Sequence, residues 1–379
     1  MRVALNAQLL SSTAGYRSAG ISRVIHHLLA ELPHVPGDEQ YLVYAPNSTP
    51  NRRLLTAPRV RSRLTRLPVE RPPVRIAWEQ SVLPVELLRE RADLLHALGF
   101  VSPIAWKGRT VVTVYDLSFM RFPEVYNRPN RLYLGTFTPP SLRRADRVIT
   151  ISEDTRRDVI ELCGVAPERV TPILLAADER FRPASPEAIT AFKARHNLPE
   201  RFVLYLGTLQ PRKNIETLVR AYARLREQGS DDHALVIAGA RGWQYESIFE
   251  LIRELGVEAF VQLPGFVPDE DQALWYSSAT VFAFPSRYEG FGLPLLEAMA
   301  CGAPVVSSSA SSLPEVVGDT GLLVDPSDVE GWCLALRQLL EDEPRRQALA
   351  EAGRARAQMF SWRRMAAETV QVYREVLQS

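Results

Sequence analysis

The stretch RFVLYLGTLQPRKNIETLVRAYARLREQG, residues 201–229, decides the fold class. Residues 202–207 form an apolar run of strand length, the next segment is a polar loop, and the remainder has apolar residues at helical spacing. Strand–loop–helix units that repeat along a chain are typical of α/β folds with parallel sheets. The fold class therefore depends on how often this strand–loop–helix unit recurs along the chain.

The same alternation extends through both halves of the chain. In the second half we expect strands at 233–239, 260–265, 280–285, 304–308 and 321–325, separated by helices at 245–256, 269–279 and 294–302. In the first half we expect strands at 2–8, 41–46, 94–98, 110–116 and 147–152, with helices at 21–32 and 153–164. Both series predict Rossmann-like, doubly wound parallel sheets.

The length of 379 residues predicts two domains, because a single core rarely extends so far. We place the boundary in the polar, proline-containing stretch 176–188, which gives an N-terminal domain at 1–180 and a C-terminal domain at 181–360. Residues 361–379 are expected to form a helix that packs back toward the N-terminal domain. Ligands of such sheets bind at the carboxyl ends of the strands, so the loops at those ends are the ones that matter for function.

Composition excludes several classes of protein. Hydrophobic content of 46% and charged content of 23% are ordinary for a globular protein, and the three cysteines form no CxxC pair. Asn6 and Gln8 interrupt the first apolar run too early for a signal peptide, and no apolar run reaches membrane-spanning length. We expect a cytoplasmic protein, with peripheral membrane contact at most. No GxGxxG follows the first strand, and no P-loop or GxSxG occurs.

Charge is distributed unevenly along the chain. Residues 1–180 carry a net charge of +7 and the remainder carries −6, and residues 51–75 alone contain eight arginines and one acid. The arginine-rich stretch is either a solvated loop or a surface that faces the phosphates of an anionic acceptor or a membrane. It contains no aromatic residue, so nucleic acid is not an expected partner.

The loop 205–214, YLGTLQPRKN, has the features of a phosphate site. Gly207 allows close approach to the backbone, and Arg212 and Lys213 stand where the following helix begins. Adjacent cations at a helix N-terminus are unfavourable unless an anion joins them. The alternative is a solvated turn, but Lys213 is one of only three lysines in a chain with 42 arginines. We favour a bound phosphate.

The segment PSRYEGFGLPLLEA, residues 285–298, has the same strand–turn–helix form. Gly290 and Gly292 permit unusual backbone angles, so a ligand can approach closely. Glu297 lies one turn into the expected helix and could accept from two adjacent hydroxyls, although a first-turn acid is also favoured by the helix dipole. Glu289 lies in the loop and gains nothing from the helix.

Other candidates carry weaker signals. Asp116 ends an apolar strand and is either a cap for the next turn or a residue of a binding cleft. His96 is a similar strand-end residue, for which a satisfied buried histidine is the commoner case. Gly15 and Gly20 bracket a loop before a helix. The acids DED at 269–271 resemble a metal motif but stand where a helix begins, so we expect no metal there.

Together these segments resemble glycosyltransferase family 4, the retaining transferases of the GT-B fold. The resemblance covers nearly the whole chain, and its most specific part is the EGFGLPLLEAMACGAPVVSSSASSLPEVVGDTGLLVDP stretch from residue 289. It implies an enzyme that transfers a hexose from a nucleoside diphosphate sugar to a saccharide or lipid-linked acceptor, without a metal cofactor. Similarity to bacterial mannosyltransferases of surface-polysaccharide or glycolipid synthesis favours mannose from GDP-mannose.

The resemblance also implies roles for individual residues. Arg212 and Lys213 match the pair that holds the donor diphosphate, Glu297 matches the acid that binds ribose, and Glu289 matches the acid beside the donor sugar. Five further positions match the segments around the donor and the first-domain glycine loop: Val267 near the nucleobase, Phe291, Gly292 and Leu293 in the turn, and Gly20.

One position departs from the family pattern. Tyr115 precedes Asp116 where family members often have histidine, and a tyrosine with an ordinary pKa of about 10 is a poor base near neutrality. Asp116, His96 or an oxygen of the leaving phosphate then remains to accept the acceptor's proton. Two other functions stay open: a sugar-nucleotide epimerase of the same architecture, and a non-catalytic protein that binds nucleotide sugars.

Overall fold

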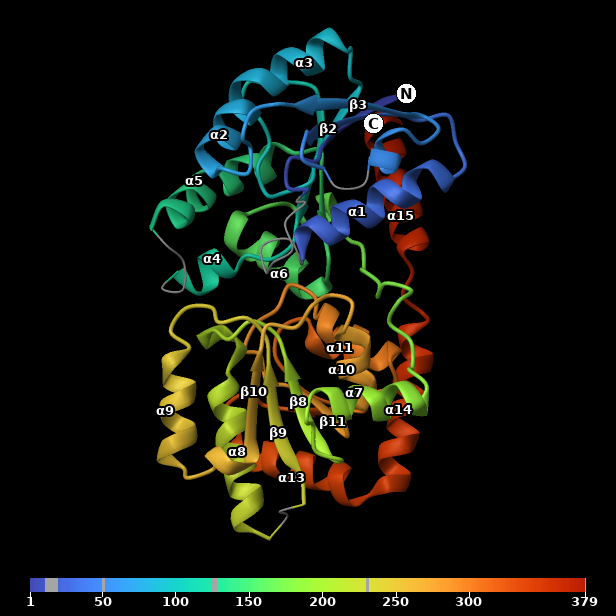
Figure 1. The fold of residues 1–379 in the computed structure, drawn as a ribbon. Coiled ribbons are helices and arrows are strands. Elements are labelled where there is room, and N and C mark those ends of the chain that lie inside the picture. The colour runs from blue at the N-terminus through green and yellow to red at the C-terminus, as the bar shows by residue number, and fades with distance from the viewer. Residues whose placement is uncertain (11–19, 50–51, 124–127, 230–231, 379) are drawn as a thin grey trace. The chain divides into compact units, whose positions relative to one another are not determined.

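The computed structural model describes residues 1–10, 20–49, 52–123, 128–229 and 232–378, with the backbone only at 52–53 and 128–130. The chain divides into two compact units: unit 1 comprises residues 1–175 and 361–379, and unit 2 comprises residues 176–360. Each unit is built around its own parallel sheet (Figure 1).

Unit 1 contains a seven-stranded sheet in the order β3-β2-β1-β4-β5-β6-β7, and all neighbouring strands are parallel. The strands are β1 (Arg2–Asn6), β2 (Gln40–Pro46), β3 (Val60–Thr65), β4 (Leu94–Ala97), β5 (Arg109–Val114), β6 (Arg147–Thr150) and β7 (Val170–Pro172). The strand order reverses between β1 and β4, so connections diverge there.

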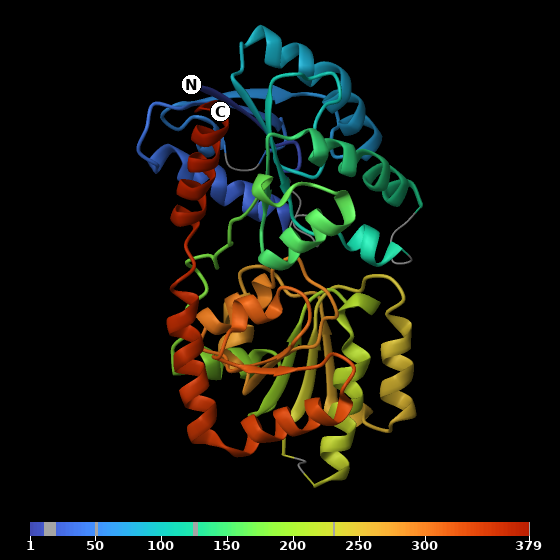
Figure 2. The ribbon, with the colours of Figure 1, turned by 180° about the vertical axis from the view of Figure 1, so that it is seen from behind.

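The helices of unit 1 cover this sheet. They are α1 (Ile21–Glu31), α2 (Pro72–Ala77), α3 (Leu83–Arg89), α4 (Ser118–Arg121), α5 (Arg128–Arg144), α6 (Glu153–Cys163) and α15 (Trp362–Gln378), with a π-helical turn at Trp78–Val82 between α2 and α3. The last helix, α15, packs against α1 and against β5 and β6, and the two chain ends lie close together (Figure 2).

Local sequence signals explain individual boundaries. The Ser152 side chain accepts a hydrogen bond of 3.0 Å from the Thr155 amide at the start of α6, and Gly164 ends that helix with φ of +66°. The expected strands and helices of unit 1 are present. The strand β3 was not expected, because its arginines at 61 and 63 hide the alternation of an edge strand.

Unit 2 contains a six-stranded parallel sheet in the order β10-β9-β8-β11-β12-β13. The strands are β8 (Phe202–Leu206), β9 (Ala234–Ala238), β10 (Val261–Gly265), β11 (Val281–Phe284), β12 (Val305–Ser308) and β13 (Leu322–Val324). The four apolar residues of β11 are fully buried, as expected for a strand covered on both faces. Here the order reverses between β8 and β11.

The helices of unit 2 are α7 (Pro186–Arg195), α8 (Ile215–Glu227), α9 (Glu246–Glu254), α10 (Gln272–Ser278), α11 (Leu293–Ala300), α12 (Leu313–Val317), α13 (Val329–Glu341) and α14 (Glu343–Ala357). A short 3₁₀ turn, Pro211–Lys213, precedes α8. The predicted doubly wound architecture is therefore confirmed in both units. In each sheet the reversal of strand order marks the edge where a ligand is expected.

Candidate functional site

Two loops meet at the reversal of strand order in unit 2. One connects β8 to α8 and carries Arg212 and Lys213, and the other connects β11 to α11 and carries Glu289. The loops are joined by a backbone hydrogen bond of 2.9 Å from the Arg287 amide to the Arg212 carbonyl. The parallel pairing of β8 with β11 thus brings together segments that are more than 70 residues apart.

A cluster of two cations and one carboxylate stands where these loops meet. Nη1 of Arg212 donates to Oε2 of Glu289 at 3.1 Å and also to the Tyr288 carbonyl, while Nζ of Lys213 donates to Oε1 of Glu289. Lys213 and Glu289 are buried. The predicted phosphate-binding pair and the predicted sugar-side acid are therefore direct neighbours.

Electrostatics keeps the Glu289 carboxylate ionised. Burial alone would raise its pKa, but the charges of Arg212 and Lys213 outweigh burial and lower the pKa of Glu289 to about 2. The cluster has one more positive than negative charge. It is therefore suited to an anion that carries more charge than a single carboxylate.

Asn214 holds the first loop in place, and sequence reasoning missed it. Its backbone is left-handed, with φ of +56°, a conformation that asparagine tolerates better than most residues. Its Nδ2 donates to the carbonyls of Pro285 and Pro326 at 3.1 and 2.6 Å, and its Oδ1 accepts from Arg287 and Thr217. The sequence signal that could have identified Asn214 is its position directly after Arg212 and Lys213.

Two serines hold the second loop, and they were also missed. Oγ of Ser311 donates to the Glu289 carbonyl at 2.6 Å and accepts from the Glu289 amide at 3.2 Å. Oγ of Ser312 lies 2.9 Å from the carbonyls of Glu289 and of Phe291. These contacts fix the backbone on both sides of Gly290, so the Glu289 side chain has a defined direction.

Two glycines permit the close packing of the loops. A Cβ on Gly239, where φ is +142°, would stand 1.9 Å from the Gly207 carbonyl oxygen. Gly292 is the N-cap residue of α11 with φ of +109°, and a Cβ there would stand 2.9 Å from Cδ2 of Leu313. Side chains at these positions would force the β8 loop and the α11 turn away from their present paths.

The remaining predicted donor residues are in the same unit. Glu297 is buried in α11, and its Oε2 accepts a hydrogen bond of 3.2 Å from the Tyr276 hydroxyl. Phe291 and Val267 are also buried, whereas Leu293 is the first residue of α11. Asp269 and Asp271, from the acidic run, contact Arg180 and Arg195 at 3.9 and 3.1 Å.

The predicted residues of unit 1 fall into two groups. Oδ1 of Asp116 accepts from the amide and the hydroxyl of Ser118, so this oxygen caps the following turn, which was one of the two expectations. Gly20 is exposed at the start of α1, where an added Cβ would meet no atom within 4 Å. Gly15 lies outside the described residues.

His96 and Tyr115 are buried in unit 1, which for His96 is the satisfied buried histidine named above as the commoner case and for Tyr115 replaces the expected cleft position. Both ring nitrogens of His96 are occupied, by the Tyr373 hydroxyl at 2.6 Å and the Thr113 hydroxyl at 2.7 Å, and burial lowers the pKa of His96 to about 3. The Tyr115 hydroxyl donates to the Leu98 carbonyl at 3.0 Å, and burial raises the pKa of Tyr115 far above its ordinary value. Neither group is suited to accept a proton near neutral pH.

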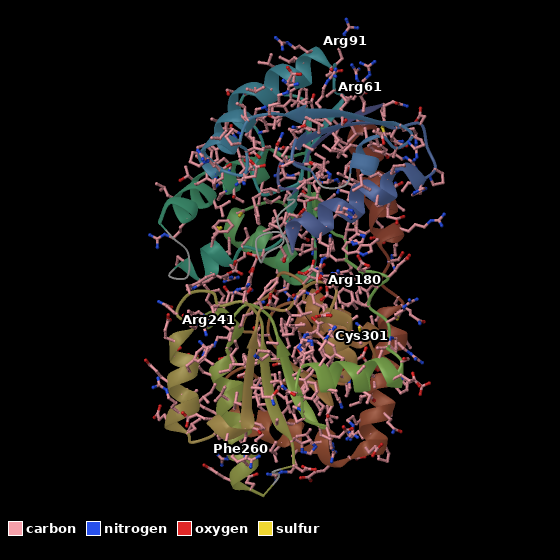
Figure 3. The ribbon with its side chains drawn as sticks, viewed as in Figure 1. Arg61, Arg91, Arg180, Arg241, Phe260 and Cys301 are labelled. Atoms are coloured by element: carbon pink, nitrogen blue, oxygen red, sulfur yellow. The ribbon has the colours of Figure 1, made fainter. Side chains whose placement is uncertain are left out.

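The arginine-rich segment 51–75 is not one solvated loop. Arg59 donates to the Pro33 and Val35 carbonyls at 2.7 and 2.6 Å. Arg61, labelled in Figure 3, and Arg63 both pair with Glu90. Nε of Arg75 lies 4.0 Å from Glu79. Much of the positive charge is therefore used within unit 1.

Comparison with known proteins assigns the chain to a family. Residues 18–180 match the description "Glycosyltransferase Family 4" and residues 187–356 match "Glycosyl transferases group 1". O-antigen chain mannosyltransferase B of Escherichia coli is 36% identical over 289 residues, which is 76% of each chain. The chain belongs to glycosyltransferase family 4.

Two further comparisons extend this result for the transferase. The serotype-specific mannosyltransferase WbdA of Escherichia coli is 34% identical over 73% of this chain and 34% of its own length. The sucrose-phosphate synthase of Thermosynechococcus elongatus has a TM-score of 0.76 at 24% identity, and the match covers 100% of this chain and 99% of that one. The fold is therefore GT-B. No helix in the described ranges is long and apolar enough to cross a membrane.

Proposed function

We propose that this transferase is a retaining enzyme that moves mannose from GDP-mannose to a saccharide or lipid-linked acceptor. The observation that carries the proposal is the cluster of Arg212, Lys213 and Glu289 at the reversal of strand order in unit 2. The choice of mannose is supported by relatives that are themselves named mannosyltransferases.

In this proposal Arg212 and Lys213 bind the donor diphosphate. Before the donor binds, the two cations are neutralised in part by Glu289. A diphosphate carries more negative charge than one carboxylate, so it competes for both cations and frees Glu289 to contact the sugar. As the bond between sugar and phosphate breaks, negative charge builds up on the leaving diphosphate, and the two preorganised cations stabilise it.

The acceptor's proton then passes to an oxygen of the departing phosphate. Tyr115 and His96 are buried and bonded, so neither serves as the base. In a front-face reaction the acceptor hydroxyl attacks from the side that the phosphate leaves. That geometry retains the anomeric configuration and needs no protein nucleophile.

A panel of nucleoside diphosphates and their sugars tests the donor. We expect GDP and GDP-mannose to raise the melting temperature more than the UDP and ADP compounds. Lys213→Ala and Glu297→Ala should each weaken donor binding by about tenfold or more, because each removes a charge-assisted hydrogen bond to the donor. Unchanged donor affinity in both variants would refute the assignment of this site.

Analysis of the product tests the reaction. We expect an α-linked mannoside by NMR, whereas an epimerase would convert the nucleotide sugar without an acceptor and a binding protein would show no turnover. Asp116→Asn retains an oxygen that can cap Ser118 but loses the negative charge. It should lower turnover more than donor affinity.

Metal removal tests the role of the cations. Because Arg212 and Lys213 supply the positive charge at the diphosphate, we propose that no metal is required. Activity should then persist in excess EDTA and should not rise when Mg²⁺ or Mn²⁺ is restored. A loss of activity that either ion reverses would contradict this proposal.

We also propose that the transferase acts in the cytoplasm, with contact at the inner face of the plasma membrane through segment 51–75. Since Arg59, Arg61, Arg63 and Arg75 have partners in unit 1, exposed Arg66 and Arg71 are the cations to test. Arg66→Gln with Arg71→Gln should weaken binding to vesicles that contain phosphatidylglycerol. Equal binding by the variant would remove this contact from the proposal.

A further inference from the structure

A buried polar cluster lies at the reversal of strand order in unit 1, outside the donor site. Asn6 is the last residue of β1, which pairs with both β2 and β4. Nδ2 of Asn6 donates to Oε1 of Glu79 at 3.1 Å, and both residues are buried. The cluster therefore stands at the carboxyl edge of the sheet, where ligands of doubly wound folds bind.

Glu79 has an unusual setting for a carboxylate. It lies in the π-helical turn Trp78–Val82, and such turns occur frequently at functional sites. The Tyr133 hydroxyl is 3.5 Å from Oε2, and Nε of Arg75 is 4.0 Å from Oε1. Burial raises the pKa of Glu79, and these partners offset that effect only in part.

Several polar atoms of this region have no partner among the described residues. They are Oδ1 of Asn6, both amide atoms of Gln8 and Nε2 of Gln80. Gln8 is only 3% exposed and follows Asn6 by two residues at the same strand end. Burying such groups without hydrogen bonds costs folding free energy, so their presence calls for an explanation.

The chemistry of these groups selects the kind of ligand. Amide side chains offer both donors and acceptors, which is the pattern that a sugar hydroxyl can meet from either side. A phosphate is disfavoured by the Glu79 carboxylate, and no group of three metal-ligating side chains occurs in the described ranges. The ligand that fits is neutral and rich in hydroxyls.

We infer that Asn6, Gln8 and Glu79 form a subsite for the hydroxyl groups of a neutral saccharide acceptor. The inference rests on the proposed transferase function and narrows its acceptor: a sugar unit without phosphate occupies this subsite. The three residues position the acceptor and take no part in bond breaking. The Glu79 side chain retains 10% exposure, whereas the unpartnered amide atoms are closed to solvent. An acceptor hydroxyl therefore reaches Glu79 first, and the amide atoms only after local opening.

Transfer kinetics on the full chain test this inference. Glu79→Gln and Gln8→Ala should each raise the KM for a neutral mannose oligosaccharide by about tenfold or more, since each loses a buried hydrogen bond to the acceptor. The donor Kd and the slow hydrolysis of donor without acceptor should remain at wild-type values. Glu86→Gln is the matched control, because it makes the same substitution in α3, where Glu86 pairs with Arg89.

The outcomes separate this inference from the function on which it rests. If no nucleotide sugar binds or is consumed by the wild-type chain, the proposed function fails. If the wild-type chain transfers mannose and folded Glu79 and Gln8 variants keep an acceptor KM within twofold of it, the cluster is only a hydrated structural network and the inference is overturned. Exclusive use of a phosphorylated acceptor would overturn it as well.

Discussion

At the scale of single residues, Glu289 determines the charge of the Arg212–Lys213–Glu289 cluster, which we propose as the donor site. Its carboxylate is buried between two cations that hold its pKa at about 2, against an ordinary value of 4.5. A pKa that is lower in the folded state contributes stability above pH 4.5, and this contribution is lost as the pH falls from 4.5 toward 2. The ion cluster should therefore stabilise unit 2 throughout the neutral range.

Replacing Lys213 by methionine tests this reading. Lys213→Met removes one partner from a buried carboxylate, so we expect a loss of about 1–3 kcal/mol at pH 7, less than the full cost of a broken buried pair because Arg212 remains. The difference from wild type should shrink between pH 4.5 and 2.5 in urea unfolding.

Lys193→Met is the matched control, since Lys193 pairs with Glu200, whose side chain is 93% exposed. Its effect on stability should be small and nearly independent of pH. A Lys213→Met penalty that stays constant down to pH 2.5 would contradict the assigned coupling.

At the scale of elements, the approach of the β8 and β9 loop ends depends on the absence of a side chain at Gly239. A methyl group there would overlap the Gly207 carbonyl, and the backbone angle of +142° is itself unfavourable for alanine. We expect Gly239→Ala to destabilise unit 2 by more than about 3 kcal/mol, well beyond the usual effect of a point mutation.

Gly256→Ala provides the comparison. Gly256 has φ of +66°, and an added Cβ would meet no atom within 4 Å, so only the left-handed backbone opposes the change. The expected cost is about 1–2 kcal/mol by thermal or urea unfolding. Equal penalties at both positions would show that close packing at Gly239 is unimportant.

A second element-scale prediction concerns α15 and the sheet of unit 1. His96 on β4 is neutral in the folded state, with a pKa of about 3, whereas the unfolded chain takes up a proton near pH 6.5. Stability should therefore decrease as the pH falls from 6.5, by up to about 1.4 kcal/mol per pH unit. His96→Gln removes this dependence, so its unfolding free energy should fall less between pH 6.5 and 5; parallel curves would refute the assignment.

Elements were more predictable from sequence than contacts. Buried strands such as β8 and β11 are continuous apolar runs that periodicity detects, but the edge strand β3 carries arginines that look like loop residues. The strand-end rule located Arg212, Lys213 and Glu289 in two loops. It did not find Ser311 and Ser312, because their role depends on a backbone contact across more than 20 residues.

The same limit left two alternatives open at His96. A polar residue near the end of an apolar strand can face a cleft or can bond to a buried partner. The partner of His96 is Tyr373, which is 277 residues away in sequence. Local patterns carry no information about such a contact. Asp116 was better specified, because its partner Ser118 is two residues further on.

At the scale of the whole molecule, the two units differ in how the chain builds them. Unit 2 is one continuous segment, 176–360, whereas unit 1 needs residues 361–379 in addition to 1–175. Helix α15 buries Met365, Val370, Tyr373 and Val376 in unit 1, and Trp362 stacks on His27 with ring centroids 4.3 Å apart. The C-terminal helix is therefore an integral part of unit 1, whose other residues are 1–175.

This construction predicts different behaviour for fragments. A fragment of residues 176–360 should fold cooperatively and bind GDP, because its sheet and the Arg212–Lys213–Glu289 cluster are complete. A fragment of residues 1–175 should not fold cooperatively. Each large apolar side chain of α15 contributes about 1.5–3 kcal/mol when buried, and a folded domain is typically stable by only about 5–15 kcal/mol. Circular dichroism in urea measures both.

Adding the missing helix provides the decisive control. A peptide of residues 361–379, supplied to fragment 1–175, should restore a cooperative transition, and the peptide with Tyr373→Ala should do so less well because it loses both the buried ring and the bond to His96. If fragment 1–175 unfolds cooperatively and with the same urea midpoint whether or not the peptide is present, α15 does not belong to the core of unit 1. The burial of its apolar face argues for the opposite result.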